Sequence, residues 1–327
     1  MYVESKRYPW LDYLKVFAIV LVVLGHSIQT LDVDFEHNLA FKYIYAFHMP
    51  LFMFISGFLS FRGSEGITFK TVKKRFLQLM VPFVCLPIVL CLLRGEADSI
   101  FKVLLNTFYA TDSGLWFLHA LFFIVFISYG INVLAHKLKI REEIVSLVVV
   151  YGLNMLQYMT AAHHFGICFI TMHLIYFTLG YYLRKYESAV YQHSKSIFWI
   201  SFLFYAFNGE FFQHSGHPTF YQYVNCGNIF AFLYPIFLGF SGCLWAYLFF
   251  KRFVKLPENR LATFIAGNTL GIYAIHQNLF QFFPVGRYLQ NSFAQTLVLF
   301  TLVFAFTSLL VLVFSRFKIT SFCILGK

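Results

Sequence analysis

Residues 12–30 read DYLKVFAIVLVVLGHSIQT, a long apolar stretch in which the ionisable side chains are Asp12, Lys15 and His26. A helix that spans a bilayer needs about 20 consecutive, mostly apolar residues. The rest of the chain has the same character: 59% of its 327 residues are hydrophobic, 12% are charged, and the mean hydropathy is +0.69. Because a soluble domain carries roughly 25% charged residues, this composition excludes a soluble enzyme and predicts an integral membrane protein.

Further apolar runs follow the first one, and they are long and unbroken. A transmembrane barrel would instead show alternating segments of about ten residues, so we expect an all-α polytopic membrane protein with about ten spans. The predicted spans are 12–30, 39–61, 76–93, 115–135, 143–159, 166–183, 196–212, 227–250, 261–284 and 293–315. The runs 143–159 and 196–212 are short for a span.

The net charge of +11 is distributed unevenly between the connecting segments. Alternate segments, beginning with the N-terminus and ending with the C-terminus, hold 20 of the 25 Lys and Arg residues. Since basic residues accumulate on the cytoplasmic side of membrane proteins, both termini are predicted to be cytoplasmic. The positive charge therefore requires no nucleic-acid partner.

One membrane domain over residues 1–327 accounts for the sequence, which has no repeat, low-complexity tract or long linker. The start lacks a small-x-small cleavage site, so the first apolar run is predicted to be an uncleaved span. The six cysteines are scattered and predict no disulfide framework.

Lys15 and His26 are 11 residues apart on the first predicted span. At about 100° and 1.5 Å per residue, both project from one face of the helix, ~16 Å apart along its axis. Ionisable residues inside spans are candidates for function, and Asp12 can pair with Lys15 at i, i+3. In the alternative interpretation, Lys15 extends to the headgroups and His26 makes a buried structural hydrogen bond. The shared face favours a functional site.

Four other histidines lie at comparable predicted depths, and a neutral imidazole is well suited to accept a proton at neutral pH. They are His48, His119, His173 and His276. Each has the alternative interpretation of a structural histidine. Glu210 is expected either to orient a histidine or bind a sugar hydroxyl, or to be a solvated loop acid. The pairs His163–His164 and His214–His217 lack a cysteine at ligand spacing, so no metal site is predicted.

Five sequence blocks, in this order, resemble the membrane acyltransferase-3 family. They are Asp12…Lys15…His26, FHMPLFMFISGF at 47–58, KKRFLQLMVPF at 73–83, WFLHALFF at 116–123 and GIYAIHQNLF at 271–280. The family signature is a basic residue, ten intervening residues and a histidine, which Lys15 and His26 fit. Many members carry Arg at the basic position; fucose 4-O-acetylase-like members often carry Lys, and they are the most similar subgroup.

The resemblance implies transfer of an acyl group, usually acetyl from acetyl-CoA, to a hydroxyl of a surface glycan. It implies acyl-CoA as a donor substrate rather than a permanently bound cofactor. The acceptor would be a cell-surface polysaccharide or a lipid-linked sugar, and the protein would lie in the bacterial inner membrane.

The residues and the resemblance together predict a mechanism. Lys15, with Arg75, compensates the charge of acyl-CoA, while His26 acts as general base or carries the acyl group. His48 is expected to stabilise the oxyanion. The predicted acceptor-binding residues are Asp12, Trp116, Glu210 and His276. Trp116, like Tyr43 and Tyr45, has the alternative of an interfacial aromatic belt, which we prefer.

Two other classes of protein remain open at this point. A transporter of a lipid-linked glycan should show an inverted repeat with interrupted helices in matching halves, and we find no such symmetry in the sequence. A non-catalytic receptor or scaffold gives no reason for Lys15 and His26 to share a face.

Overall fold

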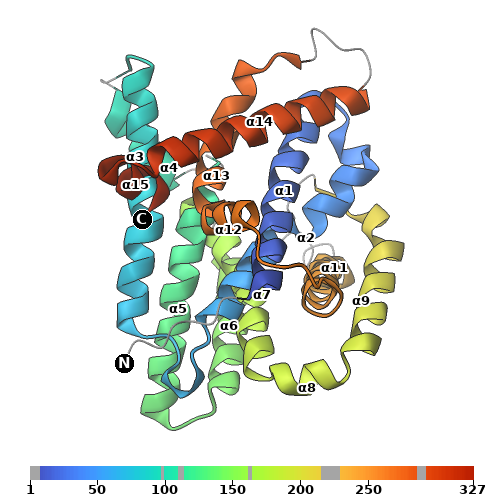
Figure 1. The fold of residues 1–327 in the computed structure, drawn as a ribbon. Coiled ribbons are helices and arrows are strands. Elements are labelled where there is room, and N and C mark those ends of the chain that lie inside the picture. The colour runs from blue at the N-terminus through green and yellow to red at the C-terminus, as the bar shows by residue number, and fades with distance from the viewer. Residues whose placement is uncertain (1–7, 97–98, 110–113, 161–163, 215–228, 286–291) are drawn as a thin grey trace. The chain divides into compact units, whose positions relative to one another are not determined.

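The computed structural model describes residues 8–96, 99–109, 114–160, 164–214, 229–285 and 292–327. These residues form helices and turns, without a strand in the described ranges, which confirms the all-α prediction (Figure 1). The long helices are α1 (Pro9–Leu31), α2 (Leu39–Ser60), α3 (Phe69–Leu93), α5 (Trp116–Leu138), α6 (Glu142–Thr160), α7 (Ile167–Lys185), α9 (Ser194–Asn208), α11 (Ile229–Leu248) and α14 (Ser292–Phe314). The shorter helices are α4 (Ile100–Tyr109), α8 (Glu187–Gln192), α12 (Arg260–Gly267), α13 (Thr269–His276) and α15 (Lys318–Leu325).

Seven segments among the described residues are long and apolar enough to cross a membrane, so the protein is polytopic. They are Pro9–Leu31, Leu39–Ser60, Phe69–Leu93, Trp116–Leu138, His164–Lys185, Leu233–Phe253 and Ser292–Phe314. Each coincides with one of the ten predicted spans. The predicted runs 143–159 and 196–212 correspond to α6, with 19 residues, and α9, with 15 residues. Neither is among the seven, so the count of ten and the cytoplasmic termini stay predictions.

The ninth predicted span, 261–284, is not one continuous helix. It divides into α12, α13 and the 3₁₀ segment η7 (Gln277–Phe282). The break lies at Asn268, which follows Gly267 and whose side chain donates to the carbonyl of Phe264 (2.7 Å). Glycine has low helix propensity, and asparagine offers the backbone a competing hydrogen bond. The interruption places His276 at the end of a short helix.

The chain divides into two compact units. Unit 1 comprises Met1–Phe52, Tyr191–Gln213 and Leu238–Val311; unit 2 comprises Met53–Val190, His214–Phe237 and Leu312–Lys327. Helices α2, α11 and α14 each pass from one unit to the other, so neither unit is a consecutive stretch of sequence. The assignment of one functional domain to residues 1–327 stays a prediction.

Unit 1 is organised around α1, which packs against α12 and α13 (Figure 1). The packed face of α1 recurs every three to four residues, as expected for a helix buried on one side. Its fully buried members are Leu14, Ala18, Ile19, Val22 and Val23. Ile28 joins Phe41 and Ile44 of α2 in a further apolar cluster. These contacts fix the orientation of α1, and with it the direction in which His26 projects.

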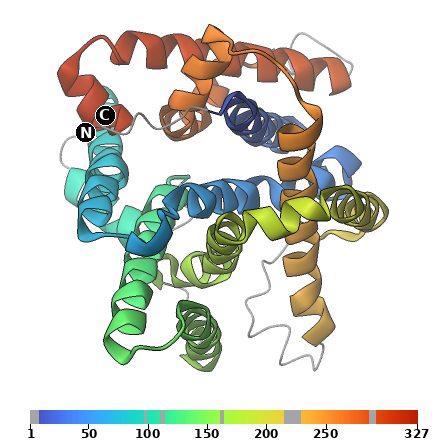
Figure 2. The same cartoon turned by 60° about the horizontal axis from the view of Figure 1, so that its bottom comes forward.

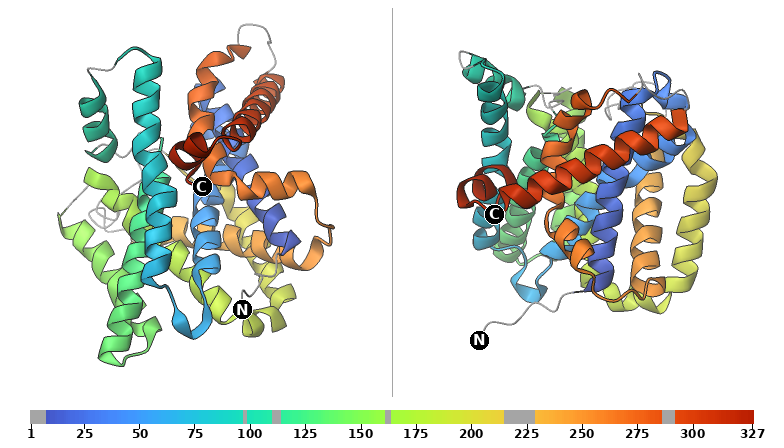
Figure 3. Two further views of the ribbon diagram at one scale, coloured as in Figure 1. Left: turned by 60° about the vertical axis from the view of Figure 1, so that its left-hand side comes forward. Right: turned by 45° about the horizontal axis from the view of Figure 1, so that its top comes forward.

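Unit 2 is built on α3, α5, α6 and α7. A short loop joins α5 to α6 as a hairpin, with Lys139 in the left-handed region at φ 55° (Figure 2). Helix α4 runs alongside α3, and α15 packs against α3 as well (Figure 3). The unit-2 part of α2 crosses α7 at two glycines, where Gly57 faces the Phe177 carbonyl and Gly180 faces the Phe54 carbonyl. Small residues at such a crossing let the two backbones approach closely.

Candidate functional site

The first predicted site residues all lie on α1, which is continuous from Pro9 to Leu31. The helical register between Lys15 and His26 is therefore unbroken, and their ~16 Å axial separation follows from ideal helix geometry. Asp12 is buried, at 9% exposure, while Lys15 and His26 are half-buried. A buried carboxylate and a half-buried cation one turn apart form one end of this face, and the imidazole of His26 forms the other.

The tautomer of His26 is set by two neighbouring side chains, Gln29 and Tyr45. Nδ1 of His26 lies 3.1 Å from Oε1 of Gln29 and 3.2 Å from the Tyr45 hydroxyl. The Tyr45 hydroxyl itself donates to the same Gln29 oxygen at 2.8 Å. Because an amide oxygen only accepts, Nδ1 of His26 carries the proton that it donates to Gln29. Nε2 of His26 is left with a lone pair, the form that a general base requires.

His276 lies beside His26, with ring centroids 5.2 Å apart and planes at 47°. Its Nδ1 is 2.7 Å from the carbonyl oxygen of Tyr273 and 3.1 Å from that of Ile272. Both oxygens accept only, so His276 donates from Nδ1 and holds a lone pair on Nε2. That Nε2 is buried and has no hydrogen-bond partner among the described residues. The site thus brings together two imidazoles that are both able to accept a proton at Nε2.

His48 is the third imidazole of this group. It is buried, at 3% exposure, and its Nδ1 donates to the Ile44 carbonyl at 2.9 Å. Its ring centroid lies 4.6 Å from that of Tyr45. We call His26, Gln29, Tyr45, His48 and His276 the imidazole cluster; all five belong to unit 1. A neutral His48 with its proton on Nδ1 also presents a lone pair at Nε2, so stabilising an oxyanion would require its imidazolium form.

The other two histidines of comparable predicted depth, His119 and His173, belong to unit 2. His119 is buried among aromatic rings, 5.3 Å from Phe83 and 4.7 Å from Phe123 between centroids. His173 donates from Nδ1 to the Phe169 carbonyl at 2.9 Å. Nδ1 of His119, like Nε2 of His276, is buried without a hydrogen-bond partner among the described residues, but its ring neighbours are phenylalanines rather than a second imidazole.

Three further predicted site residues lie outside the imidazole cluster. Trp116, the first residue of α5, stacks on Phe169 at 4.5 Å. Arg75 was expected just ahead of a span starting at residue 76, but α3 begins earlier, at Phe69, because Thr68 caps it. Arg75 therefore lies on the helix itself, where it donates to Gln78 (3.4 Å). Glu210 is exposed, and its backbone carbonyl, rather than its carboxylate, accepts from Lys42 Nζ at 3.0 Å.

Gln29 and Tyr45 are the members of the cluster that sequence reasoning did not select as site residues. Gln29 carries a usable signal, since it lies at i+3 from His26 on the same predicted helix. For Tyr45 the sequence favours the aromatic belt over stacking on a sugar, and in the structure its hydroxyl donates to Gln29 Oε1 at 2.8 Å. Among the residues that the structure describes, no three His, Cys, Asp or Glu side chains are grouped closely enough to hold a metal ion. His163 and His217 lie outside the described residues.

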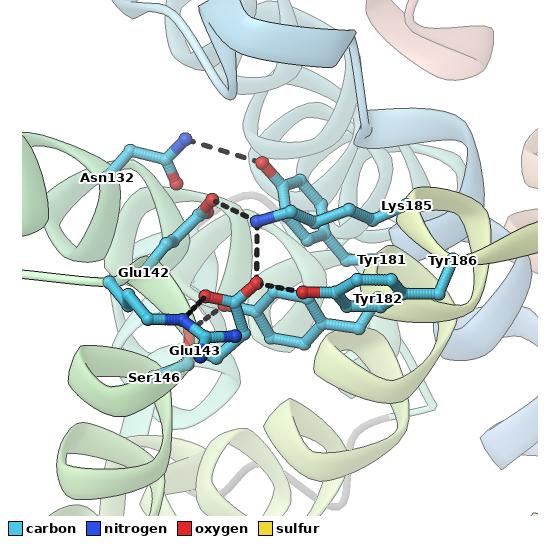
Figure 4. Close-up of polar contacts among 9 residues, drawn as sticks. Asn132, Glu142, Glu143, Ser146, Tyr181, Tyr182, Lys185 and Tyr186 are labelled. Carbon is cyan, nitrogen blue, oxygen red and sulfur yellow. Dashed lines mark hydrogen bonds and ion pairs between the residues drawn. The ribbon is translucent and has the colours of Figure 1, made fainter.

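A second polar cluster joins the N-terminus of α6 to the C-terminus of α7 in unit 2 (Figure 4). Lys185 lies 2.7 Å from Glu143 and 3.9 Å from Glu142, and Tyr186 also donates to Glu143. Burial raises the pKa of Glu142, and Lys185 opposes that shift. A cavity of about 600 Å³ adjoins this network and is lined in part by His136, Lys139 and Glu142. The network holds the two helix ends together.

The described residues thus form a polytopic, all-helical fold of the kind found in integral membrane proteins, with a group of histidines buried in unit 1. The chain belongs to the membrane acyltransferase-3 family: the family model, described as an acyltransferase domain, matches residues 8–316. This confirms the resemblance found in the sequence.

Two curated relatives match part of the chain. The nodulation protein NolL of Sinorhizobium fredii is 42% identical over 76 residues, which are 22% of this chain and 21% of the relative. The nodulation protein NolL of Mesorhizobium japonicum is 42% identical over 76 residues, 22% of this chain and 20% of the relative. The match thus spans about a fifth of the length of these relatives. No solved structure matches the chain.

Proposed function

We propose that this protein is a membrane O-acyltransferase that moves an acetyl or other short acyl group from cytosolic acyl-CoA to a sugar hydroxyl. The acceptor would be a cell-surface polysaccharide or a lipid-linked sugar. The observation that carries the proposal is the 3.1 Å contact between Nδ1 of His26 and Oε1 of Gln29, from which we infer that Nε2 of His26 is the proton acceptor. Membership of the acyltransferase-3 family supports the reaction class. The likeness to fucose 4-O-acetylase-like members and the location in the bacterial inner membrane remain part of the proposal.

The chemistry begins with proton transfer at His26. Nε2 of His26 accepts the proton of the acceptor hydroxyl as the hydroxyl oxygen bonds to the thioester carbonyl carbon. The carbon–sulfur bond then breaks, and the proton passes from His26 to the departing sulfur, which leaves as the free thiol of CoA. In a variant of this route, Nε2 attacks the thioester carbonyl carbon, the carbon–sulfur bond breaks and CoA leaves as the thiolate. The acyl group then passes from Nε2 to the hydroxyl oxygen, and the hydroxyl proton goes to the thiolate. Both routes require the same tautomer.

Lys15 is proposed to neutralise part of the charge on acyl-CoA, from a level ~16 Å away from His26 along α1. Lysine supplies a point charge rather than the two-pronged geometry of arginine. Arg75, in unit 2, is proposed to assist because it follows Lys73 and Lys74 in a basic stretch of α3 that we expect near the cytoplasm. Donor charge would thus be met at the cytoplasmic side and acyl transfer would occur at the imidazole cluster.

His48 is proposed to act at the oxyanion only as the imidazolium, since its Nδ1 proton is already donated to the Ile44 carbonyl. Contacts of Asp12, Trp116 and Glu210 with the acceptor also remain proposals. For Trp116, the stack on Phe169 supports the alternative of aromatic packing.

The alternative function is movement of a lipid-linked glycan across the membrane without chemistry. The break between α12 and α13 at Asn268 favours it, because interrupted helices line the sites of many transporters. The two functions differ in their products: an acyltransferase leaves an ester on a glycan of normal length, whereas a transporter affects whether the glycan reaches the surface.

The test compares wild type with His26→Ala, and with His119→Ala as a matched buried-histidine control, in purified full-length protein supplied with radiolabelled acetyl-CoA and in cells. Loss of label transfer and of the glycan ester in His26→Ala alone, at normal glycan length and protein level, is the expected result. Full transfer by His26→Ala contradicts the proposal. Trapped or truncated glycan in the cells, without any loss of ester per sugar, supports transport instead.

A further inference from the structure

The feature that the proposed reaction does not use is the lone pair on Nε2 of His276. His276 is 1% exposed, and its Nε2 has no hydrogen-bond partner among the described residues. A buried acceptor left without a donor is destabilising, so such an atom in a site next to His26 points to a ligand that brings a donor.

The donor substrate cannot supply this hydrogen at the reacting end. The thioester group of acyl-CoA offers a carbonyl oxygen and a sulfur, which are acceptors, and a neutral His276 also offers an acceptor at Nε2 because its proton is on Nδ1. Two acceptors do not bond. Of the two substrates, the acceptor can supply the hydrogen, because its hydroxyl groups are donors.

The position of His276 beside His26 indicates which hydroxyl of the acceptor donates to Nε2 of His276. Its ring centroid lies 5.2 Å from that of His26, and the hydroxyl that reacts is the one bound to Nε2 of His26. Two hydroxyls on neighbouring ring carbons, when cis or both equatorial, are about one hydrogen-bond length apart, ~2.8 Å. Such a pair is compatible with two imidazoles whose ring centroids are 5.2 Å apart. Neighbouring hydroxyls that are both axial point in opposite directions and do not.

We propose that the acceptor of this protein is a sugar with a cis or diequatorial vicinal diol at the acylated position. One hydroxyl of the diol gives its proton to His26, and its neighbour donates a hydrogen bond to Nε2 of His276. This inference rests on the proposed acyltransferase function and specifies its substrate class. His276 touches the acceptor in this scheme but takes no proton from it, so it determines specificity.

The experiment measures kcat/KM of the purified full-length protein with acetyl-CoA and a panel of methyl hexosides and methyl 6-deoxyhexosides. The glycoside that is acylated fastest is then compared with two deoxy analogues of itself. One lacks the hydroxyl next to the acylated position, and the other, as a control, lacks a remote hydroxyl. Sites that hydrogen-bond a substrate hydroxyl reject the analogue without it, so we expect kcat/KM to fall about 10- to 100-fold for the first analogue and little for the second.

His276→Phe allows a double-mutant cycle in which one change is made in the enzyme and the other in the substrate. The variant is expected to acylate the parent glycoside as poorly as wild type acylates the neighbour-deoxy analogue, and to show no additional loss with that analogue. His276→Gln, which keeps an acceptor oxygen, should retain part of the preference. His119→Phe, equally buried but in unit 2, should leave the preference unchanged.

The outcomes separate this inference from the function on which it rests. Equal losses for the two deoxy analogues in wild type, or equal losses for parent and analogue in His276→Phe, overturn the inference while acyl transfer stands. Should His276→Phe fail to fold, the comparison of analogues in wild type still decides. Absence of acyl transfer to the surface glycan of cells as well as to every glycoside overturns the proposed function, and the inference with it.

Discussion

His26 and His276 are far apart in the sequence, yet their ring centroids lie 5.2 Å apart. Each donates from Nδ1 to an oxygen, Gln29 Oε1 for His26 and backbone carbonyls for His276, and each is left with a lone pair at Nε2. Two bases side by side are an unusual pair, since a single proton acceptor suffices for acyl transfer. The Nδ1 partner of His26 is a side-chain amide, which can move with its neighbours, whereas the Nδ1 partners of His276 are helix carbonyls, which hold its ring in one orientation. We infer that the two histidines have different roles.

Gln29→Leu is expected to lower kcat about 10- to 100-fold with little change in KM, because the acceptor that fixes the His26 tautomer is lost. Gln29→Glu restores an acceptor and should recover most of the rate. The measurement is steady-state kinetics with acetyl-CoA and the best glycoside acceptor. Ser27→Ala, which removes only a bond from a hydroxyl to the backbone of α1, serves as control. If Leu and Glu at position 29 give the same rate, Gln29 does not act through the tautomer of His26.

Lys15→Ala is expected to raise KM for acyl-CoA about 10- to 100-fold, since a charge-assisted contact with the donor is lost. Lys15→Arg keeps the charge and should stay near wild type. The two variants are compared by titrating acetyl-CoA at fixed acceptor. Lys42→Ala removes a cation of α2 that donates to the Glu210 carbonyl and should leave KM for acyl-CoA unchanged. An unchanged KM in Lys15→Ala removes Lys15 from donor binding.

The sequence predicts the apolar elements well because hydropathy is a local property. Seven of the predicted spans coincide with helices that meet the length and apolarity of a span. The predicted span 76–93 covers the apolar part of α3. The helix itself begins earlier, at Phe69, and hydropathy does not register its first turns because they are rich in lysine. The interruption at Asn268 had a signal in Gly267–Asn268, which the apolar residues on both sides outweighed.

The site was predictable only where its geometry is local. The common face of Lys15 and His26 follows from helix periodicity, and Gln29 could have been found in the same way. The approach of His276 to His26 depends on how α13 packs against α1, for which neither residue carries a local signal. The same holds for the crossing of α2 and α7, where two glycines that look ordinary in the sequence each meet a carbonyl of the other helix.

Gly57→Ala and Gly180→Ala are each expected to destabilise the protein by about 1–3 kcal/mol, because the added methyl overlaps a backbone carbonyl that cannot move like a flexible side chain. Gly152→Ala is the matched control, as its Cβ would meet open space and alanine is favoured in a helix. It should be neutral or stabilising. Thermal unfolding of the purified protein in detergent measures all three, and a normal midpoint for Gly57→Ala contradicts the close crossing.

The ion pair between Lys185 and Glu143 should contribute about 0.2–1 kcal/mol, since both side chains are partly exposed, at 29% and 25%. Lys185→Gln and Glu143→Gln are each expected to lower the unfolding midpoint slightly, and the double variant should lose less than the sum of the two single losses. Salt should shrink this coupling because it screens exposed charges. Arg141→Gln is the comparison variant, because Arg141 also lies 3.7 Å from Glu143 but its side chain is 74% exposed. Its coupling with Glu143 should be weaker than that of Lys185. Strict additivity between positions 143 and 185 would show that their contact does not stabilise the junction of α6 and α7.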